Sequence, residues 1–115
     1  DNLISETYYV QELEYQQHID SAARARQAGA TITCNAASNT VVITLPAGQL
    51  GENLSVKIEF YRPSSSALER EFKLAPAADG TQTLDVSKLA YGLWWVRASW
   101  QAGGRDYLLE QKITL

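Results

Sequence analysis

The segment LSVKIEFYR, residues 54–62, alternates apolar and polar side chains from end to end. Successive side chains of an extended chain point to opposite faces, so the apolar residues share one face. That face carries Leu54, Val56, Ile58 and Phe60. The other face carries Ser55, Lys57, Glu59 and Tyr61. The pattern is typical of a half-buried β-strand whose apolar face lies on a core.

Similar short segments follow one another after Gly29. The predicted strands are residues 31–35, 40–45, 54–62, 70–76, 81–87, 93–100 and 107–115, with turns at AASN (36–39) and QAGGRD (101–106). The residues expected to point inward from the middle strands are Phe72, Leu74, Leu84 and Val86. About seven strands with no helix between them predict an immunoglobulin-like antiparallel β-sandwich. The Cys–Trp–Cys spacing of antibody domains is absent, so the term describes architecture alone.

The segment before Gly29 has a different period. Residues 5–28 contain no proline or glycine and are rich in helix formers, with Ser5 as the expected N-cap and Gly29 as the stop. The sequence therefore predicts a mostly β fold in which an N-terminal amphipathic helix, residues 1–28, precedes a sandwich domain, residues 29–115.

The predicted helix carries an aromatic stripe. Residues at helical spacing on one side are Tyr8, Glu12, Tyr15, Ile19 and Ala22, and Tyr9 and Leu13 widen this stripe. Such a stripe has two uses, since it can pack on the chain's own sandwich or stay available to a partner. The structural use and the partner-binding use both remain open at this point.

Composition excludes several classes of function. The chain has 115 residues, a formal net charge of −3 and scattered basic residues, which argues against a nucleic-acid binder. No apolar run approaches the ~20 residues that a membrane-spanning helix needs. Because the chain starts at Asp1, we expect that an anchor or signal can precede it. The single cysteine cannot form an internal disulfide.

Few residues are suited to catalysis or metal binding. His18 is the only histidine, and it shares a helix face with Glu14, a pair that holds a divalent ion weakly at best. Cys34 is expected to be a small buried strand residue, with a copper ligand or redox thiol as the alternatives. The run SSS at 64–66 indicates a loop with no base nearby in sequence. The sequence therefore predicts a non-enzyme with no catalytic residues, no metal site beyond the weak candidates His18 and Cys34, and no cofactor.

The tryptophans divide between two faces. Alternation assigns Trp94, Val96, Ala98 and Trp100 to the core. It places Trp95 on the other face with Arg97, where three arrangements are open: stacking on Arg97, cover by the N-terminal helix, or contact with a partner.

Four stretches together resemble a known family. The run LISETYYVQELEYQQHIDSAARA is similar to the segment after the membrane anchor in FixH (CcoH) proteins, especially those of Bacteroidetes. The motifs FYRPS (60–64) and LAYGLWWVRASW (89–100) are also similar, as is the closing set Gly104, Tyr107, Glu110 and Ile113. Two positions depart from the family pattern: Ser65 replaces an acidic residue, and Trp95 replaces a polar one.

The resemblance implies a single-pass inner-membrane protein whose sandwich lies on the periplasmic side, with residues 1–28 as a membrane-proximal stalk. It implies help in assembling a cbb-type haem–copper cytochrome c oxidase, with oxidase subunits or a copper-transporting P-type ATPase as partners. The candidate partner-binding residues are Tyr8, Tyr9, Leu13, Tyr15, Ile19, Trp95 and Arg97. The helix could also pair two copies of the chain.

Two other functions remain open from the sequence. A copper-handling domain needs soft ligands, and the chain offers one cysteine, one histidine and no methionine. Association of copper through partner proteins, without a site on this chain, also remains open. An adhesion or carbohydrate-binding module would use exposed aromatic rings, for which Trp95 and Tyr61 are the candidates.

Overall fold

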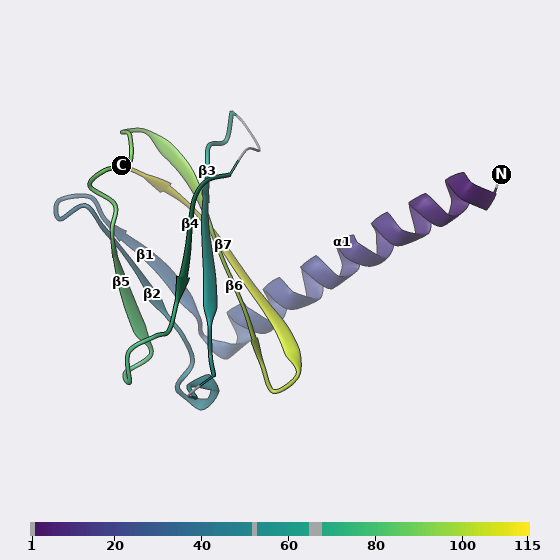
Figure 1. The fold of residues 1–115 in the computed structure, drawn as a ribbon, viewed down its shortest axis with the longest axis horizontal. Coiled ribbons are helices and arrows are strands. Elements are labelled where there is room, and N and C mark those ends of the chain that lie inside the picture. Colours follow the sequence, from purple (N-terminus) through teal and green to yellow (C-terminus); the bar gives the residue numbers. More distant parts are fainter. Residues whose placement is uncertain (1, 52, 65–67) are drawn as a thin grey trace.

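The computed structural model describes residues 2–51, 53–64 and 68–115, and within them one long helix precedes seven antiparallel strands (Figure 1). The helix is α1 (Asn2–Ala28), and a 3-10 turn, η1 (Ala47–Gln49), follows the second strand. The strands are β1 (Thr31–Asn35), β2 (Thr40–Thr44), β3 (Val56–Tyr61), β4 (Leu68–Leu74), β5 (Thr81–Asp85), β6 (Leu93–Ala102) and β7 (Arg105–Thr114). The predicted helix-then-sandwich fold is confirmed.

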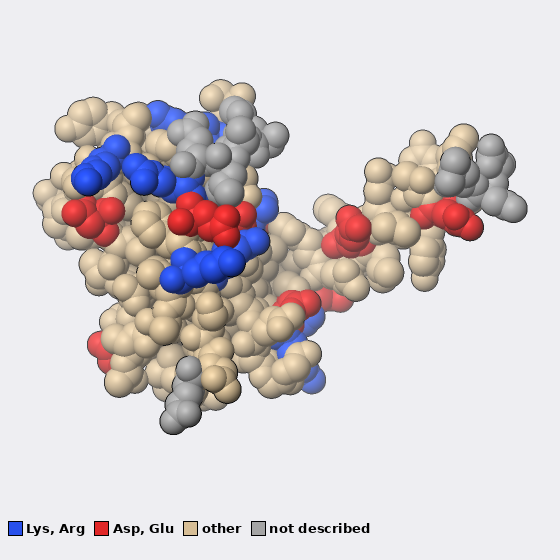
Figure 2. All heavy atoms as spheres, in the orientation of Figure 1, with Lys and Arg blue, Asp and Glu red and all other residues tan. Residues whose placement is uncertain are grey.

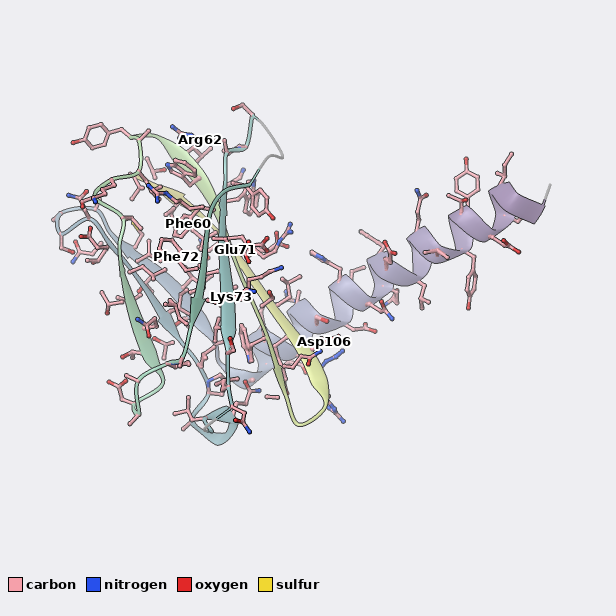
Figure 3. The ribbon with its side chains drawn as sticks, viewed as in Figure 1. Phe60, Arg62, Glu71, Phe72, Lys73 and Asp106 are labelled. Atoms are coloured by element: carbon pink, nitrogen blue, oxygen red, sulfur yellow. The ribbon has the colours of Figure 1, made fainter. Side chains whose placement is uncertain are left out.

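The strands form two facing sheets. One has the order β1-β2-β5 and the other the order β4-β3-β6-β7, and every pairing is antiparallel. Phe60 and Phe72 lie between the sheets (Figure 3), where their rings meet edge to face with centroids 5.9 Å apart. The fully buried centre of the core is formed by Val41, Ile43, Val56, Ile58, Phe60, Trp94 and Val96.

The alternation predicted for β3 is confirmed on its apolar face, where Val56, Ile58 and Phe60 are buried. Its polar face differs at one residue, because Glu59 is only 8% exposed. On the outer face of the sheet, Oε2 of Glu59 accepts a hydrogen bond from the Tyr61 hydroxyl and lies 3.8 Å from Nζ of Lys57, and its cross-strand neighbours are Glu71 and Arg97. An alternating strand pattern predicts the face of the sheet on which a side chain lies, but not which other side chains surround it there.

The β6–β7 hairpin is tighter than predicted. Residues Gln101, Ala102, Arg105 and Asp106 belong to the strands, so the connection shrinks to Gly103 and Gly104. Both glycines have positive φ angles, 57° and 74°, which suit a two-residue hairpin turn. The long register places Trp94, Val96, Ala98 and Trp100 in the core, as predicted.

The C-terminal end of α1 has a clear local cause. The helix ends at Ala28 because Gly29 adopts φ +88°, and the amides of Gly29 and Ala30 donate to the carbonyls of Arg26 and Ala25. At the other end the helix begins at Asn2, so the predicted N-cap at Ser5 is wrong. Nothing in residues 2–4 breaks a helix, and a serine is tolerated inside one. The division of the chain at residue 28 into two units stays a prediction.

Candidate functional site

Most of α1 projects away from the sandwich (Figure 1). Only its C-terminal part packs on the protein, where Ser21 and Ala25 are buried against the sheets, and Ala25 is 0% exposed. Small side chains let the helix backbone approach β7 closely. Leu108, on the outer face of β7, is buried in the same region. The helix is therefore held at one end and free of the sandwich at the other.

The predicted stripe lies on the projecting part. Tyr8 is 68% exposed and Tyr15 is 63% exposed, and Tyr9, Leu13 and Ile19 are exposed as well. The helix therefore does not dock on the sandwich through this stripe, because Ser21 and Ala25 make that contact. The pattern identified residues that share a face, but small residues set which face can approach the sheet.

Two more apolar residues, which the predicted stripe does not include, extend the exposed surface. Ile4 and Val10 are both exposed on the projecting part. At about 100° per residue, Ile4, Tyr8, Tyr15 and Ile19 lie within about 60° of one another around the helix axis. We call these four residues the aromatic seam.

His18 joins the helix to the sheet. Its Nε2 lies 2.9 Å from Oε1 of Glu110 on β7. The other oxygen of Glu110 accepts hydrogen bonds from Nε and Nη2 of Arg97 on β6, both at 3.2 Å. The sequence places His18 beside Glu14 on one face of the helix, whereas its close partner, Glu110, lies across the interface on β7. In the sequence, the only signal at Glu110 is its place in the closing family motif.

Trp95 and Arg97 lie on the outer face of the four-stranded sheet. Arg97 does not stack on Trp95, because its guanidinium lies over the ring of Tyr61 at 5.2 Å. The Nζ of Lys112 lies 5.1 Å from the centroid of Trp95, its cross-strand neighbour. Both rings suggested for carbohydrate stacking thus have a cation over them.

A row of charges crosses this outer face. The cross-strand register aligns Glu71, Glu59, Arg97 and Glu110 on β4, β3, β6 and β7. The hydroxyl of Tyr61 donates to Oε2 of Glu59 at 2.8 Å. Burial raises the pKa of Tyr61, and the adjacent Glu59 carboxylate raises it further. Figure 2 shows acidic and basic side chains side by side on this face.

An open groove of about 680 Å³ separates α1 from the sheet. Glu14, Gln17 and His18 line its helix side, and Lys57, Lys73 and Asp106 are among the residues on the sheet side. Figure 3 labels two of the residues on the sheet side, Lys73 on β4 and Asp106 on β7. The groove mixes charges of both signs.

Arg62 connects two of the family motifs through direct contacts. Its Nη1 donates to the carbonyl of Leu93 at 3.0 Å and its Nη2 to that of Tyr91 at 3.2 Å. The guanidinium lies 4.1 Å from the centroid of the buried Trp94 ring. The motif at 60–64 therefore binds the motif at 89–100 through the Arg62 side chain. Ser65, where the chain departs from the family pattern, and most of the SSS run lie outside the described residues.

Cys34 on β1 is half-buried and packs at the margin of the core. Across residues 2–51, 53–64 and 68–115, the structure contains no group of three or more His, Cys, Asp or Glu side chains placed to hold a metal ion. In the same ranges, no helix combines the length and hydrophobicity that a membrane crossing requires.

Comparison with known protein families identifies the family of this chain. A search of curated proteins returned no match. A scan against protein-family profiles matches residues 1–114 to FixH. That match spans nearly the whole length described above, including the projecting helix and the Arg62 contact, and the chain belongs to the FixH family.

Proposed function

We propose that this protein assists the maturation of a cbb-type haem–copper cytochrome c oxidase through protein contacts made by the projecting part of α1. The family is a non-catalytic, accessory one, and membership suggests a role in maturing this class of oxidase. Proteins of the family are typically membrane-anchored. In our proposal, an anchor precedes α1 in the inner membrane and the sandwich lies on the periplasmic side.

The observation that carries the proposal is the exposure of apolar residues on a helix fixed at its other end. An exposed apolar patch on a soluble domain commonly marks a contact surface. Tyrosine suits a contact near a bilayer surface, because its ring accepts apolar neighbours while its hydroxyl stays hydrated. Oxidase subunits or a copper-transporting ATPase are the partners proposed. The face bearing Trp95 and Arg97 is the second contact proposed.

The test replaces Tyr8 and Tyr15 by serine together in the full-length, membrane-anchored protein. Both side chains are more than 60% exposed, so the free energy of unfolding should change by less than about 0.5 kcal/mol. That change corresponds to about 2 °C in melting temperature for 115 residues. We expect assembled oxidase in membranes, measured by its haem spectrum and activity, to fall while the melting temperature stays.

The matched control is Tyr91→Ser, which removes a tyrosine that is 86% exposed on the sandwich. This variant should leave oxidase levels unchanged. Normal oxidase levels in the double variant would refute the proposal. A large fall in melting temperature would show that the tyrosines belong to the folded core.

A further inference from the structure

The projecting helix is acidic, whereas the rest of the chain is not. Residues 2–20 hold four of the 13 acidic residues and none of the 10 basic ones. The remaining chain therefore has nine acidic and ten basic residues, a net charge of +1 against −4. Figure 2 shows acidic patches and no basic ones on the visible face of the projecting part.

The aromatic seam has the geometry of a helix–helix contact. Ile4, Tyr8, Tyr15 and Ile19 are spaced four, seven and four residues apart, which is the spacing of residues that face a neighbouring helix. They span about 22 Å along the axis, or about four turns. Ser21 and Ala25 lie about 110° around the helix from the seam, so packing on β7 leaves it open.

Charge decides between the possible occupants of the seam. A second copy would bring one acidic helix against another, and like charges beside a helix seam disfavour pairing. An anionic lipid surface would repel the same carboxylates. A helix bearing Lys and Arg beside its apolar face would be attracted by both the carboxylates and the tyrosine rings.

The sandwich already shows how this chain's aromatic rings receive cations. Arg62 lies over Trp94 at 4.1 Å, Arg97 over Tyr61 at 5.2 Å, and Lys112 over Trp95 at 5.1 Å. Tyr8 and Tyr15 offer the same kind of ring on the acidic helix.

We infer that the aromatic seam binds a basic amphipathic helix of a partner protein, laid lengthwise along α1. Apolar residues of that helix fill the seam between Ile4 and Ile19, and its Lys and Arg side chains meet Glu12 and the tyrosine rings. This inference rests on the proposed function and names the chemistry of its partner.

The test uses the 115-residue chain and three labelled synthetic peptides of about 21 residues, or three heptads. One is helical, with leucines at seam positions and Lys and Arg beside them. The second keeps the leucines and replaces the basic residues by Glu. The third has the composition of the first in scrambled order, so it carries the same charge without a seam. Binding is followed by fluorescence anisotropy.

We expect saturable one-to-one binding of the basic helical peptide, weakening as NaCl rises from about 50 to about 300 mM. Tyr8→Ser with Tyr15→Ser should weaken binding by about tenfold or more. Tyr91→Ser should leave it within about twofold. The Glu-flanked and scrambled peptides should bind at least about tenfold more weakly than the basic helix.

Four results would overturn the inference: equal binding of the scrambled peptide, equal binding of the Glu-flanked peptide, self-association of the chain at lower concentration than peptide binding, or tighter binding to phosphatidylglycerol vesicles. If peptide binding fails while the double tyrosine variant still lowers oxidase assembly in cells, the partner chemistry is wrong and the proposed function stands. If the peptide binds but assembly is unaffected, the proposed function fails instead.

Discussion

Replacing Arg62 by alanine removes the contact that fastens two of the family motifs together. Two hydrogen bonds to backbone carbonyls and one contact with the Trp94 ring are lost. Because the carbonyls lie near the surface, each hydrogen bond contributes about 0.5–1 kcal/mol, and the ring contact contributes about 1 kcal/mol. The free energy of unfolding should therefore fall by about 2–3 kcal/mol.

That loss converts to a measurable shift in melting temperature. At about 2.1 cal/mol/K per residue, the unfolding entropy of 115 residues is about 0.24 kcal/mol/K, and the shift is about 8–12 °C. Arg62→Lys keeps the charge but loses the two-pronged donor, so about half of the effect is expected. Thermal unfolding by circular dichroism, with urea titration beside it, measures both variants.

The control is Arg105→Ala, which removes an exposed arginine at the start of β7. It should shift the melting temperature by less than about 2 °C. A shift this small for Arg62→Ala, or an equal shift for the two alanine variants, would refute the structural role assigned to Arg62. The family motif at 60–64 would then need a functional explanation.

Three further variants test the helix attachment and the loops. Gly29→Ala should lower the free energy of unfolding in urea by about 1–2 kcal/mol, because φ is +88° at this position. An added Cβ meets nothing within 4 Å, so no steric clash adds to that cost, and an unchanged free energy of unfolding would argue against this helix stop. Glu110→Gln should weaken the contact with His18 and increase hydrogen exchange in the last turns of α1, with little change in melting temperature; unchanged exchange would contradict that link. Hydrogen bonds from residues 81 and 87 lower the pKa of Asp79 and of Asp85, so each carboxylate contributes stability above its ordinary pKa that is lost as pH falls through the lowered value. Urea midpoints measured from about pH 5 to about pH 2.5 should show a smaller decline in a variant with both aspartates changed to asparagine, and identical declines would exclude this origin.

The sheet architecture was predictable because its signal is local. Alternation along residues 54–62 and 93–100 assigns each side chain to a face, and burial of one face follows from the hydrophobic effect. The assignment of Trp94 inward and Trp95 outward depends only on this alternation. The glycine stop at residue 29 is equally local, because only the residue's own backbone conformation decides it.

The helix attachment was not predictable from the same pattern. The stripe of large apolar residues on α1 left docking through Tyr8 and Tyr15 open, yet Ser21 and Ala25 make the contact. Helix position depends on which face can approach another surface closely, and this requires knowing the shape of that surface. Small residues carry little hydrophobic signal, so periodicity overlooks them.

The polar contacts were unpredictable for a related reason. Arg62 reaches residues 29 and 31 positions further along the chain, and His18 meets Glu110 across 92 positions. No local pattern encodes such separations. Glu59 likewise lies between cross-strand neighbours, Glu71 and Arg97, that its own sequence pattern does not specify.

Site-specific crosslinking in cells tests most directly whether a partner protein contacts the aromatic seam of α1. A photoreactive phenylalanine analogue replaces Tyr8, Tyr15 or, as the matched control, Tyr91 in the full-length protein, and adducts are identified by mass spectrometry. We expect positions 8 and 15 to crosslink to a subunit of the cbb-type oxidase or to the copper-transporting ATPase, and position 91 to give no such adduct. The same adducts from position 91, or adducts at positions 8 and 15 only with lipid or a second copy of the chain, would contradict the account.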